Sequence, residues 1–166
     1  MGIEIERRFL VKNQDWKLTV ILSENFNQGY LNSISDKWTT RVRIIDNTKA
    51  YITLKSSKNG LVNYEFEYHI PTKDAIQLFK LSEHKITKTR YQLKVNDKNW
   101  VVDSFSGLNA SLEIAEIELG SESEQITLPT WCGQEITGIK SLSNASLAKT
   151  PISSLSIKDR LKTKDH

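Results

Sequence analysis

Apolar and polar residues alternate along most of this chain with a period of two. At its start, Ile3, Ile5 and Phe9 alternate with charged side chains. A period of two places successive side chains on opposite faces of a β-strand. The alternation predicts eight strands, at residues 2–12, 27–33, 37–45, 50–55, 63–70, 86–95, 99–105 and 111–119.

Short segments of turn-forming residues separate several of these strands. Asp46-Asn47-Thr48, Ser57-Lys58-Asn59-Gly60 and Asn96-Asp97-Lys98 have the composition of hairpin turns. The strands that flank each turn are therefore expected to pair antiparallel. Because no repeat or Pro/Gly-rich linker divides the chain, we expect one domain over residues 1–155, followed by a polar C-terminal tail at 156–166.

Three short helices are predicted beside the strands. The first covers residues 72–81, with Thr72 as its N-cap. The second is expected to begin at Thr130, and the third covers residues 144–149. Residues 159–166 are polar and are expected to fray.

The polar faces of the strands carry charges of one sign at positions two apart. Five pairs follow this rule: Glu4 and Glu6, Arg41 and Arg43, Glu65 and Glu67, Lys88 and Arg90, and Glu116 and Glu118. Arg8, Lys55 and Asp103 are further charges on the same strands. Side chains two apart in a strand lie about 6.5–7 Å from each other. Like charges at that distance repel unless opposite charge lies between or beside them.

Eight strands with this spacing fit a β-sandwich or a β-barrel, and the period does not separate the two. If the apolar faces pack outward against helices, the charged faces line an interior. In a closed barrel of about eight strands, that interior is narrow and is sized for side chains and a small ligand. Burying so many ions costs more than their pairing returns. We therefore expect water, metal ions and an anion to share the space.

The residue types indicate which ligand the interior would take. Basic side chains bind phosphate oxygens, and arginine does so with two parallel hydrogen bonds. Carboxylates bind Mg²⁺ or Mn²⁺, which prefer oxygen ligands and keep substrate phosphates as co-ligands. A polyphosphate with a divalent metal satisfies both sets of residues. The competing interpretation is an ordinary β domain whose charged strands face water.

Composition limits the classes of protein that remain. The 166 residues suit one domain, and no apolar run approaches the roughly 20 residues that a membrane-spanning helix needs. A single cysteine, Cys132, excludes an internal disulfide and a CxxC metal motif. A net charge of +3 is too small to indicate a nucleic-acid partner. We expect a cytoplasmic protein that binds neither nucleic acid nor membrane.

A set of short motifs, in a fixed order, narrows the assignment. The first is Glu4-Ile5-Glu6-Arg7-Arg8. The others are Gln28-Gly29-Tyr30-Leu31, Arg41-Val42-Arg43, Thr53-Leu54-Lys55, Glu65-Phe66-Glu67-Tyr68, Lys88-Thr89-Arg90-Tyr91, Val102-Asp103-Ser104-Phe105, Ala115-Glu116-Ile117-Glu118-Leu119 and Ser143-Asn144-Ala145-Ser146-Leu147-Ala148. This order, from residue 3 to about residue 151, resembles the CYTH family, or triphosphate tunnel metalloenzymes. The first motif resembles that family's ExExK signature, with arginine in the last position.

The resemblance implies an α+β fold, in which an eight-stranded antiparallel closed β-barrel forms a tunnel with peripheral helices and a C-terminal plug helix. It implies that a triphosphate lies in the tunnel, held by Arg8, Arg41, Arg43, Lys55, Lys88 and Arg90. It implies Mg²⁺ or Mn²⁺ at Glu4, Glu6, Asp103, Glu116 and Glu118, with Glu65 and Glu67 lining the tunnel. A homodimer is compatible with the family.

The implied activity is metal-dependent hydrolysis of a triphosphate, with inorganic tripolyphosphate as the first candidate substrate. In this reaction Glu4, Glu6 or Glu118 would orient the attacking water. Lys88 is either a phosphate contact or, with a pKa depressed by neighbouring cations, a base. Arg8 keeps the positive charge of the signature lysine but cannot lose its proton. Tyr30 is either a hydrogen-bond donor inside the tunnel or a packed core residue. The alternatives are a class IV-like adenylate cyclase that converts ATP to cyclic AMP and pyrophosphate, a thiamine triphosphatase, and a non-catalytic polyphosphate or nucleotide sensor.

Overall fold

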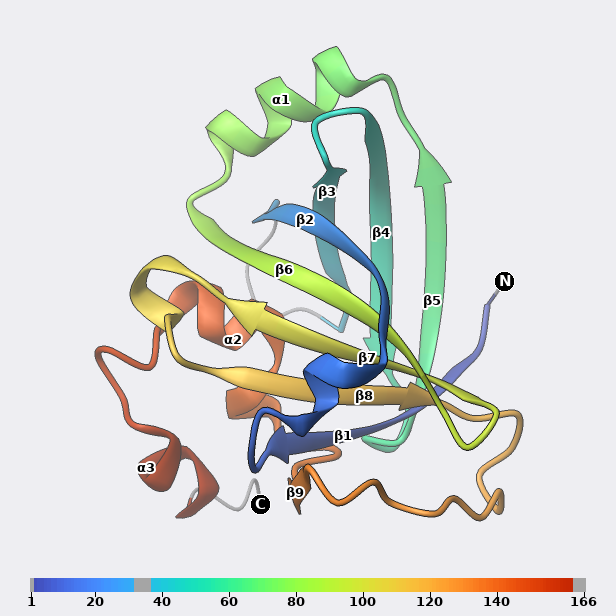
Figure 1. Ribbon diagram of the computed structural model, residues 1–166. Coiled ribbons are helices and arrows are strands. Elements are labelled where there is room, and N and C mark those ends of the chain that lie inside the picture. Colours follow the sequence, from blue (N-terminus) through green and yellow to red (C-terminus); the bar gives the residue numbers. More distant parts are fainter. Residues whose placement is uncertain (1, 32–36, 163–166) are drawn as a thin grey trace.

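The computed structural model describes residues 2–31 and 37–162, and its central element is one antiparallel sheet closed into a barrel (Figure 1). The barrel strands are β1 (Glu4–Val11), β2 (Val20–Tyr30), β3 (Thr39–Ile45), β4 (Lys49–Ser57), β5 (Val62–His69), β6 (His84–Val95), β7 (Lys98–Phe105) and β8 (Glu113–Glu118). Their order around the barrel is β1-β5-β4-β3-β2-β6-β7-β8, and β8 pairs with β1 again. The sheet closes where Glu4 of β1 lies opposite Asn63 of β5. The predicted eight-stranded barrel is confirmed, and a sandwich is excluded.

Two of the hairpins are set by their turn residues. Asp46 and Asn47, between β3 and β4, have φ values of 47° and 58°. Asn96 and Asp97, between β6 and β7, have φ values of 49° and 60°. Asn and Asp adopt positive φ more readily than other residues with a side chain, and such turns match the twist of paired strands. The pairing of these neighbours was therefore predictable from local sequence.

A ninth strand, β9 (Cys132–Glu135), lies outside the barrel along β1. The prediction of a helix from Thr130 is wrong. β5 pairs with only the first half of the β1 edge, and β9 pairs with the second half. Gly133 permits the close approach, because a Cβ there would come within 2.8 Å of the Leu10 carbonyl oxygen. The segment forms a strand because it pairs with the free edge of β1, and local sequence does not reveal such an edge.

The second strand was also predicted wrongly, because it begins at Val20 and not at residue 27. Ile21 and Leu22 are exposed, so the first part of β2 shows no alternation of buried and exposed residues. Pairing with β6 holds it in the sheet nevertheless. The predicted end is wrong as well, since β2 stops at Tyr30, and residues 32 and 33 lie outside the described part of the chain.

The helices are α1 (Thr72–Leu81), α2 (Asn144–Lys149) and α3 (Ile157–Lys162), and the 3₁₀ helices are η1 (Asp15–Thr19), η2 (Gly107–Asn109) and η3 (Lys140–Leu142). Thr72 is not the N-cap of α1, because Pro71 takes that position and the Thr72 hydroxyl donates to the Thr48 carbonyl instead. The expectation of a frayed end is wrong for residues 159–162, which belong to α3. α3 is fixed to the protein by Arg160, whose exposed fraction is 1%.

Apolar clusters cover much of the barrel wall and close one of its ends. Outside β1, β6, β7 and β8, a cluster contains Phe9, Trp16, Leu93, Trp100, Val102, Ala115, Ile117, Leu119 and Trp131. Ala75 of α1 packs on Val42, Ile44 and Ala50 of β3 and β4. The third cluster, here called the plug cluster, contains Tyr30, Ile86, Phe105, Leu112, Ile114, Ile136, Leu142, Ala145 and Leu147. Because η3 and α2 supply its last three members, the C-terminal segment closes that end of the barrel.

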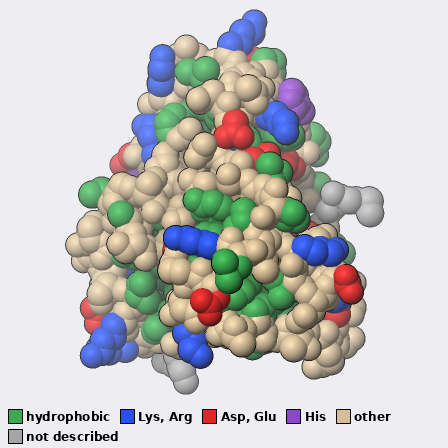
Figure 2. All heavy atoms as spheres, in the orientation of Figure 1, with side chains coloured by type: hydrophobic (Ala, Val, Ile, Leu, Met, Phe, Trp, Pro, Cys, Tyr) green, Lys and Arg blue, Asp and Glu red, His purple; other side chains and the backbone are tan. Residues whose placement is uncertain are grey.

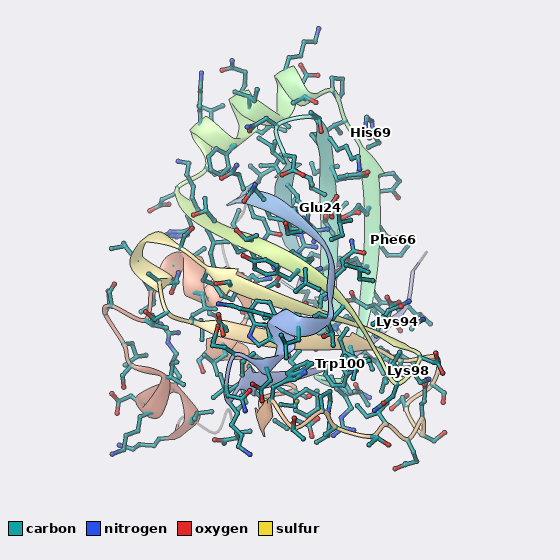
Figure 3. All side chains as sticks on the ribbon, in the orientation of Figure 1. Glu24, Phe66, His69, Lys94, Lys98 and Trp100 are labelled. Carbon is teal, nitrogen blue, oxygen red and sulfur yellow. The ribbon has the colours of Figure 1, made fainter. Side chains whose placement is uncertain are left out.

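The outer face of β5 is less covered than the rest of the wall. Tyr64, Phe66 and Tyr68 on this strand are each at least 38% exposed. Phe66, labelled on β5 in Figure 3, packs its ring 6.0 Å from that of Trp38. In Figure 2, charged side chains are scattered over the visible face and form no large patch of one sign. Within the described ranges, no helix is long and apolar enough to cross a membrane.

Candidate functional site

The charged pairs predicted from the sequence face the inside of the barrel, where register brings opposite signs together. β1 and β8 place Arg8 opposite Glu116, and β6 and β7 place Arg90 opposite Asp103. β4 and β5 place Lys55 opposite Glu65. Other pairs find opposite charge two strands away: Arg41 and Arg43 of β3 contact Glu65 and Glu67 of β5, and Glu4 and Glu6 of β1 contact Lys55 of β4. Two groups of ions form, each named below after its central residue.

The Asp103 group is the most deeply buried part of the interior. Asp103 is fully buried and accepts hydrogen bonds from Arg90 Nε and Nη2, both at 2.7 Å, and from the Lys88 ammonium. Glu116 accepts from Arg90 Nη2 at 2.7 Å and from Arg8 Nε at 3.0 Å. Two carboxylates and three cations from four strands therefore form one continuous network.

The Lys55 group lies beside it and consists of carboxylates around one ammonium. Lys55 Nζ lies 3.0 Å from Glu6 Oε1 and 3.3 Å from Glu65 Oε2, and it donates a third, short bond to Glu4. Glu65 also lies 3.5 Å from Arg41 Nη2. Here the carboxylates outnumber the cations that contact them.

A smaller set joins β3, β4 and β5. Arg43 Nη1 lies 3.1 Å from Glu67 Oε2, which also accepts a hydrogen bond from the Thr53 hydroxyl at 2.9 Å. Arg43 Nε donates to Gln28 Oε1 at 3.2 Å. Burial and the neighbouring Arg41 lower the pKa of Arg43 to about 10. Arg43 is therefore a cation whose neighbours incompletely compensate its charge, as an anion-binding residue requires.

Burial and crowding bring two interior pKa values close to neutrality. Burial, followed by repulsion from Glu6, raises the pKa of Glu4 to about 7. Burial, followed by repulsion from Arg90, lowers the pKa of Lys88 to about 7 despite the attraction of Asp103. Both groups can therefore gain or lose a proton near neutral pH.

Both carboxylates of the Asp103 group, in contrast, stay ionised. Burial alone would raise the pKa of Glu116, but the attraction of Arg90 and Arg8 outweighs it and holds that pKa below its usual range. Burial would likewise raise the pKa of Asp103, but the attraction of Arg90 and Lys88 outweighs burial and lowers that pKa. These two residues are permanent anions at neutral pH.

Two interior residues of β2 escaped the sequence prediction: Phe26, because the predicted strand began at residue 27, and Gln28, which lay within that strand but was assigned no role. The ring of Phe26 lies 5.3 Å from the guanidinium carbons of both Arg43 and Arg90, and 5.7 Å from Lys88 Nζ. Gln28 is fully buried, and its Nε2 has no hydrogen-bond partner in the described part of the chain. The period of two was the signal that could have located them, because Glu24, Phe26, Gln28 and Tyr30 lie two apart and therefore share one face of the strand.

Not every predicted site residue joins these networks. Glu118 is exposed at the end of β8, opposite Glu6 in the register. Tyr30 belongs to the plug cluster and is 4% exposed, and burial raises the pKa of its hydroxyl, which lies near Arg41 and Arg43. This placement is compatible with both roles predicted for Tyr30. His69 lies at the exposed end of β5, labelled in Figure 3, with its ring 5.4 Å from that of Tyr51.

The donor set fits a divalent metal, although the carboxylates are engaged elsewhere. Glu4, Glu6 and Glu65 surround a cation, the Lys55 ammonium, with hard oxygen atoms of the kind that Mg²⁺ and Mn²⁺ prefer. Within residues 2–31 and 37–162, no three Asp, Glu, His or Cys side chains are arranged to hold a metal directly. A metal would therefore need carboxylates to leave their present ion pairs.

Fold and interior together define a closed β-barrel protein with a highly charged interior. The chain belongs to the CYTH domain family, whose model matches residues 2–150. It is similar to the inorganic triphosphatase of Acetivibrio thermocellus, with 37% identity over 153 residues that cover 91% of this chain and 96% of that protein. It is also similar to the inorganic triphosphatase of Nitrosomonas europaea, with 34% identity over 150 residues, 87% of this chain and 96% of that protein.

A solved structure of an inorganic triphosphatase supports the same relationship. Its TM-score to this chain is 0.66, with 32% identity, and the match covers 87% of this chain and 93% of that one. The expected family is therefore confirmed by both sequence and fold. Membership of the family carries the expectation of a divalent metal.

Proposed function

We propose that this chain hydrolyses inorganic tripolyphosphate with Mg²⁺ or Mn²⁺. The observation that carries the proposal is the barrel interior, where Arg8, Arg41, Arg43, Lys55, Lys88 and Arg90 lie in one lumen with carboxylates. The similarity to two inorganic triphosphatases supports the choice of substrate.

The tunnel cations would bind the triphosphate by exchanging partners. Each of these cations contacts a carboxylate in this structure, although the neighbours of Arg43 compensate its charge only in part. Phosphate oxygens match guanidinium groups at least as well as carboxylates do. Gln28, whose buried amide nitrogen has no partner in the described part of the chain, would donate one further hydrogen bond. A bound triphosphate would thus release carboxylates from their ion pairs.

Four of the carboxylates assigned to the metal would be released in this way: Glu4, Glu6, Asp103 and Glu116. The fifth, Glu118, is already exposed at the end of β8. A bound divalent ion would supply charge neutralisation and polarise the phosphoryl group. Since Glu4 has a pKa of about 7, its carboxyl must lose its proton before it can act as a ligand. Metal and triphosphate are therefore expected to favour each other's binding.

The proton of the attacking water would be taken up by a group with a pKa near 7. Glu4 meets that condition, and Glu6 would help to orient the water. Lys88 has a pKa of about 7 in the free protein, but a bound triphosphate would raise that pKa, so Lys88 would hold a phosphate as a cation. Arg8 occupies the position of the signature lysine and stays protonated, so its role is to hold a phosphate. Phosphoryl transfer depends mainly on such positioning and charge neutralisation.

The test is phosphate release from tripolyphosphate, ATP and thiamine triphosphate with Mg²⁺ or Mn²⁺. Glu4→Gln and Glu6→Gln should each lower the rate for tripolyphosphate by roughly a hundredfold or more. Glu83→Gln, at an exposed position between α1 and β6, is the matched control and should keep full activity. Cyclic nucleotide and pyrophosphate from ATP would instead indicate a cyclase. Metal-dependent binding without turnover would indicate a sensor, and absence of both binding and turnover would overturn the proposal.

A further inference from the structure

Two successive backbone carbonyls of η3 are held by two arginines from different parts of the protein. The carbonyl of Leu142 accepts hydrogen bonds from Nη1 and Nη2 of Arg8, both at 3.2 Å. The carbonyl of Ser141 accepts from Nη1 of Arg160 on α3. In the described ranges no backbone N–H bonds either carbonyl, so the arginines are the groups that hold these two oxygen atoms.

Arg160 ties the C-terminal segment together. Its guanidinium also donates to the carbonyls of Thr150 and, at 3.0 Å, Leu155. The Ser141 hydroxyl in turn donates to the Arg160 carbonyl at 3.3 Å. A fully charged side chain at 1% exposure is held here by its backbone acceptors. It lies outside residues 2–150, the part of the chain that the family model matches.

Arg8 depends on η3 for its orientation. A guanidinium has five N–H donors in a fixed plane, and Arg8 uses one on Glu116 and two on the Leu142 carbonyl. Two acceptors at different edges fix both the position and the rotation of the plane. The remaining donors are then directed in advance toward a ligand, which lowers the entropy cost of binding.

Packing alone leaves the direction of these carbonyls open. The Leu142 side chain is fully buried in the plug cluster, which fixes where the residue lies. The orientation of a peptide plane in a short 3₁₀ segment also depends on what binds its oxygen atoms. The N–H groups of the two peptides also hold η3, since Leu142 N donates to the Ile139 carbonyl at 3.0 Å and Ser143 N donates to the Lys140 carbonyl at 2.9 Å. Loss of the Arg160 contact would leave the Ser141–Leu142 peptide held only through its N–H. A shift of η3 would then move the next carbonyl, that of Leu142, which accepts from Arg8.

We propose that Arg160 is a positioning residue that orients Arg8 for the triphosphate through the backbone of η3. The inference rests on the proposed function, in which Arg8 holds a phosphate. It gives the C-terminal helix a role in substrate affinity that does not require contact with the substrate.

The test is a double-mutant cycle on affinity for tripolyphosphate, measured by calorimetry without metal and as KM with metal. Arg160→Gln should raise Kd and KM about tenfold and change kcat by less than about threefold. Arg160→Lys, which keeps a donor in reach of the carbonyls, should recover most of the affinity. Lys158→Gln, exposed on the same helix, is the matched control and should leave affinity unchanged.

The cycle is completed in an Arg8→Lys background, where the planar fork that binds the Leu142 carbonyl is absent. There Arg160→Gln should have no further effect on Kd, while its effect on stability in urea persists. Additive losses of affinity in the two backgrounds would overturn the inference, as would a loss of stability with unchanged Kd. If Arg160→Gln does not fold, Arg160→Lys replaces it in the cycle. Arg160→Lys should then raise Kd about threefold in the wild-type background and should not change Kd in the Arg8→Lys background. Absence of binding by the wild-type protein would instead count against the proposed function.

Discussion

Replacing Asp103 with asparagine removes the charge at the centre of the Asp103 group and keeps the shape of the side chain. Asp103 is fully buried and accepts two 2.7 Å hydrogen bonds from Arg90 and one from Lys88. Removing one partner of a buried ion pair costs about 3–5 kcal/mol, because the other charge is left uncompensated. The structure indicates the lower end of that range.

Two features limit the loss. Lys88 has a pKa of about 7 and can release its proton when its partner is lost, whereas Arg90 cannot. Arg90 keeps Glu116 at 2.7 Å. We therefore expect the free energy of unfolding to fall by about 3 kcal/mol, which corresponds to a Tm lower by about 6–12 °C for a domain of this size.

Urea unfolding measures this loss through tryptophan fluorescence, since Trp16, Trp100 and Trp131 are at most 4% exposed. Asp97→Asn is the matched control. Asp97 lies in an exposed turn with φ of 60°, a conformation that asparagine also adopts readily. Its free energy of unfolding should stay within about 0.5 kcal/mol of the wild-type value.

Tripolyphosphate without metal should then stabilise Asp103→Asn more than the wild-type protein. An anion in the lumen replaces the missing negative charge, and a ligand that binds only the folded state stabilises it in proportion to its affinity. A loss below about 1 kcal/mol, or equal stabilisation of both proteins, would refute the reasoning that the tunnel cations require a buried anion.

Three further predictions concern other parts of the tunnel. At pH 8 a Lys88 with a pKa of about 7 is mostly neutral. A bound triphosphate raises that pKa, so Lys88 takes up a proton when the triphosphate binds. The wild-type protein should therefore take up about 0.9 proton more than Lys88→Arg, whose arginine is already protonated. Calorimetry in buffers of different ionisation enthalpy measures this uptake, and an equal uptake in both proteins would contradict the prediction. Lys55→Met leaves three carboxylates around an absent cation, so Mg²⁺ should raise its Tm by several degrees and that of the wild type by less than about 1 °C. Equal shifts in a thermal denaturation series would show that the ammonium does not stand in for a metal. Leu147→Ala should lower the free energy of unfolding by about 2–5 kcal/mol, since Leu147 is fully buried in the plug cluster. Leu81→Ala, at 82% exposure, is its control in urea unfolding, and similar losses in both would argue against the plug packing.

Local sequence predicted those parts of the molecule that depend on neighbouring residues. The period of two places Glu65 and Glu67 on one face of a strand wherever that strand lies in the sheet. The turn at Asn96 and Asp97 favours positive φ through its own side chains. These features, with the order of the charged motifs, were sufficient for the strand content, the charged lumen and the family.

Tertiary structure decided the elements whose partners are distant in the chain. β9 forms because the edge of β1 beyond β5 is free, and β2 begins early because β6 pairs with it. No pattern in the local sequence records either of these partners. The errors at residues 20–26 and after Pro129 therefore have one cause, which is pairing that overrides local preference.

The sequence by itself determined that carboxylates and cations line one face of the barrel wall. Only the closed sheet decided which of them meet: Arg90 with Asp103, and Lys55 with three carboxylates. Strand register sets these contacts, and the register depends on how the whole sheet closes. The pKa values near 7 at Glu4 and Lys88 follow from the same packing, because burial and neighbouring charges are properties of the assembled lumen.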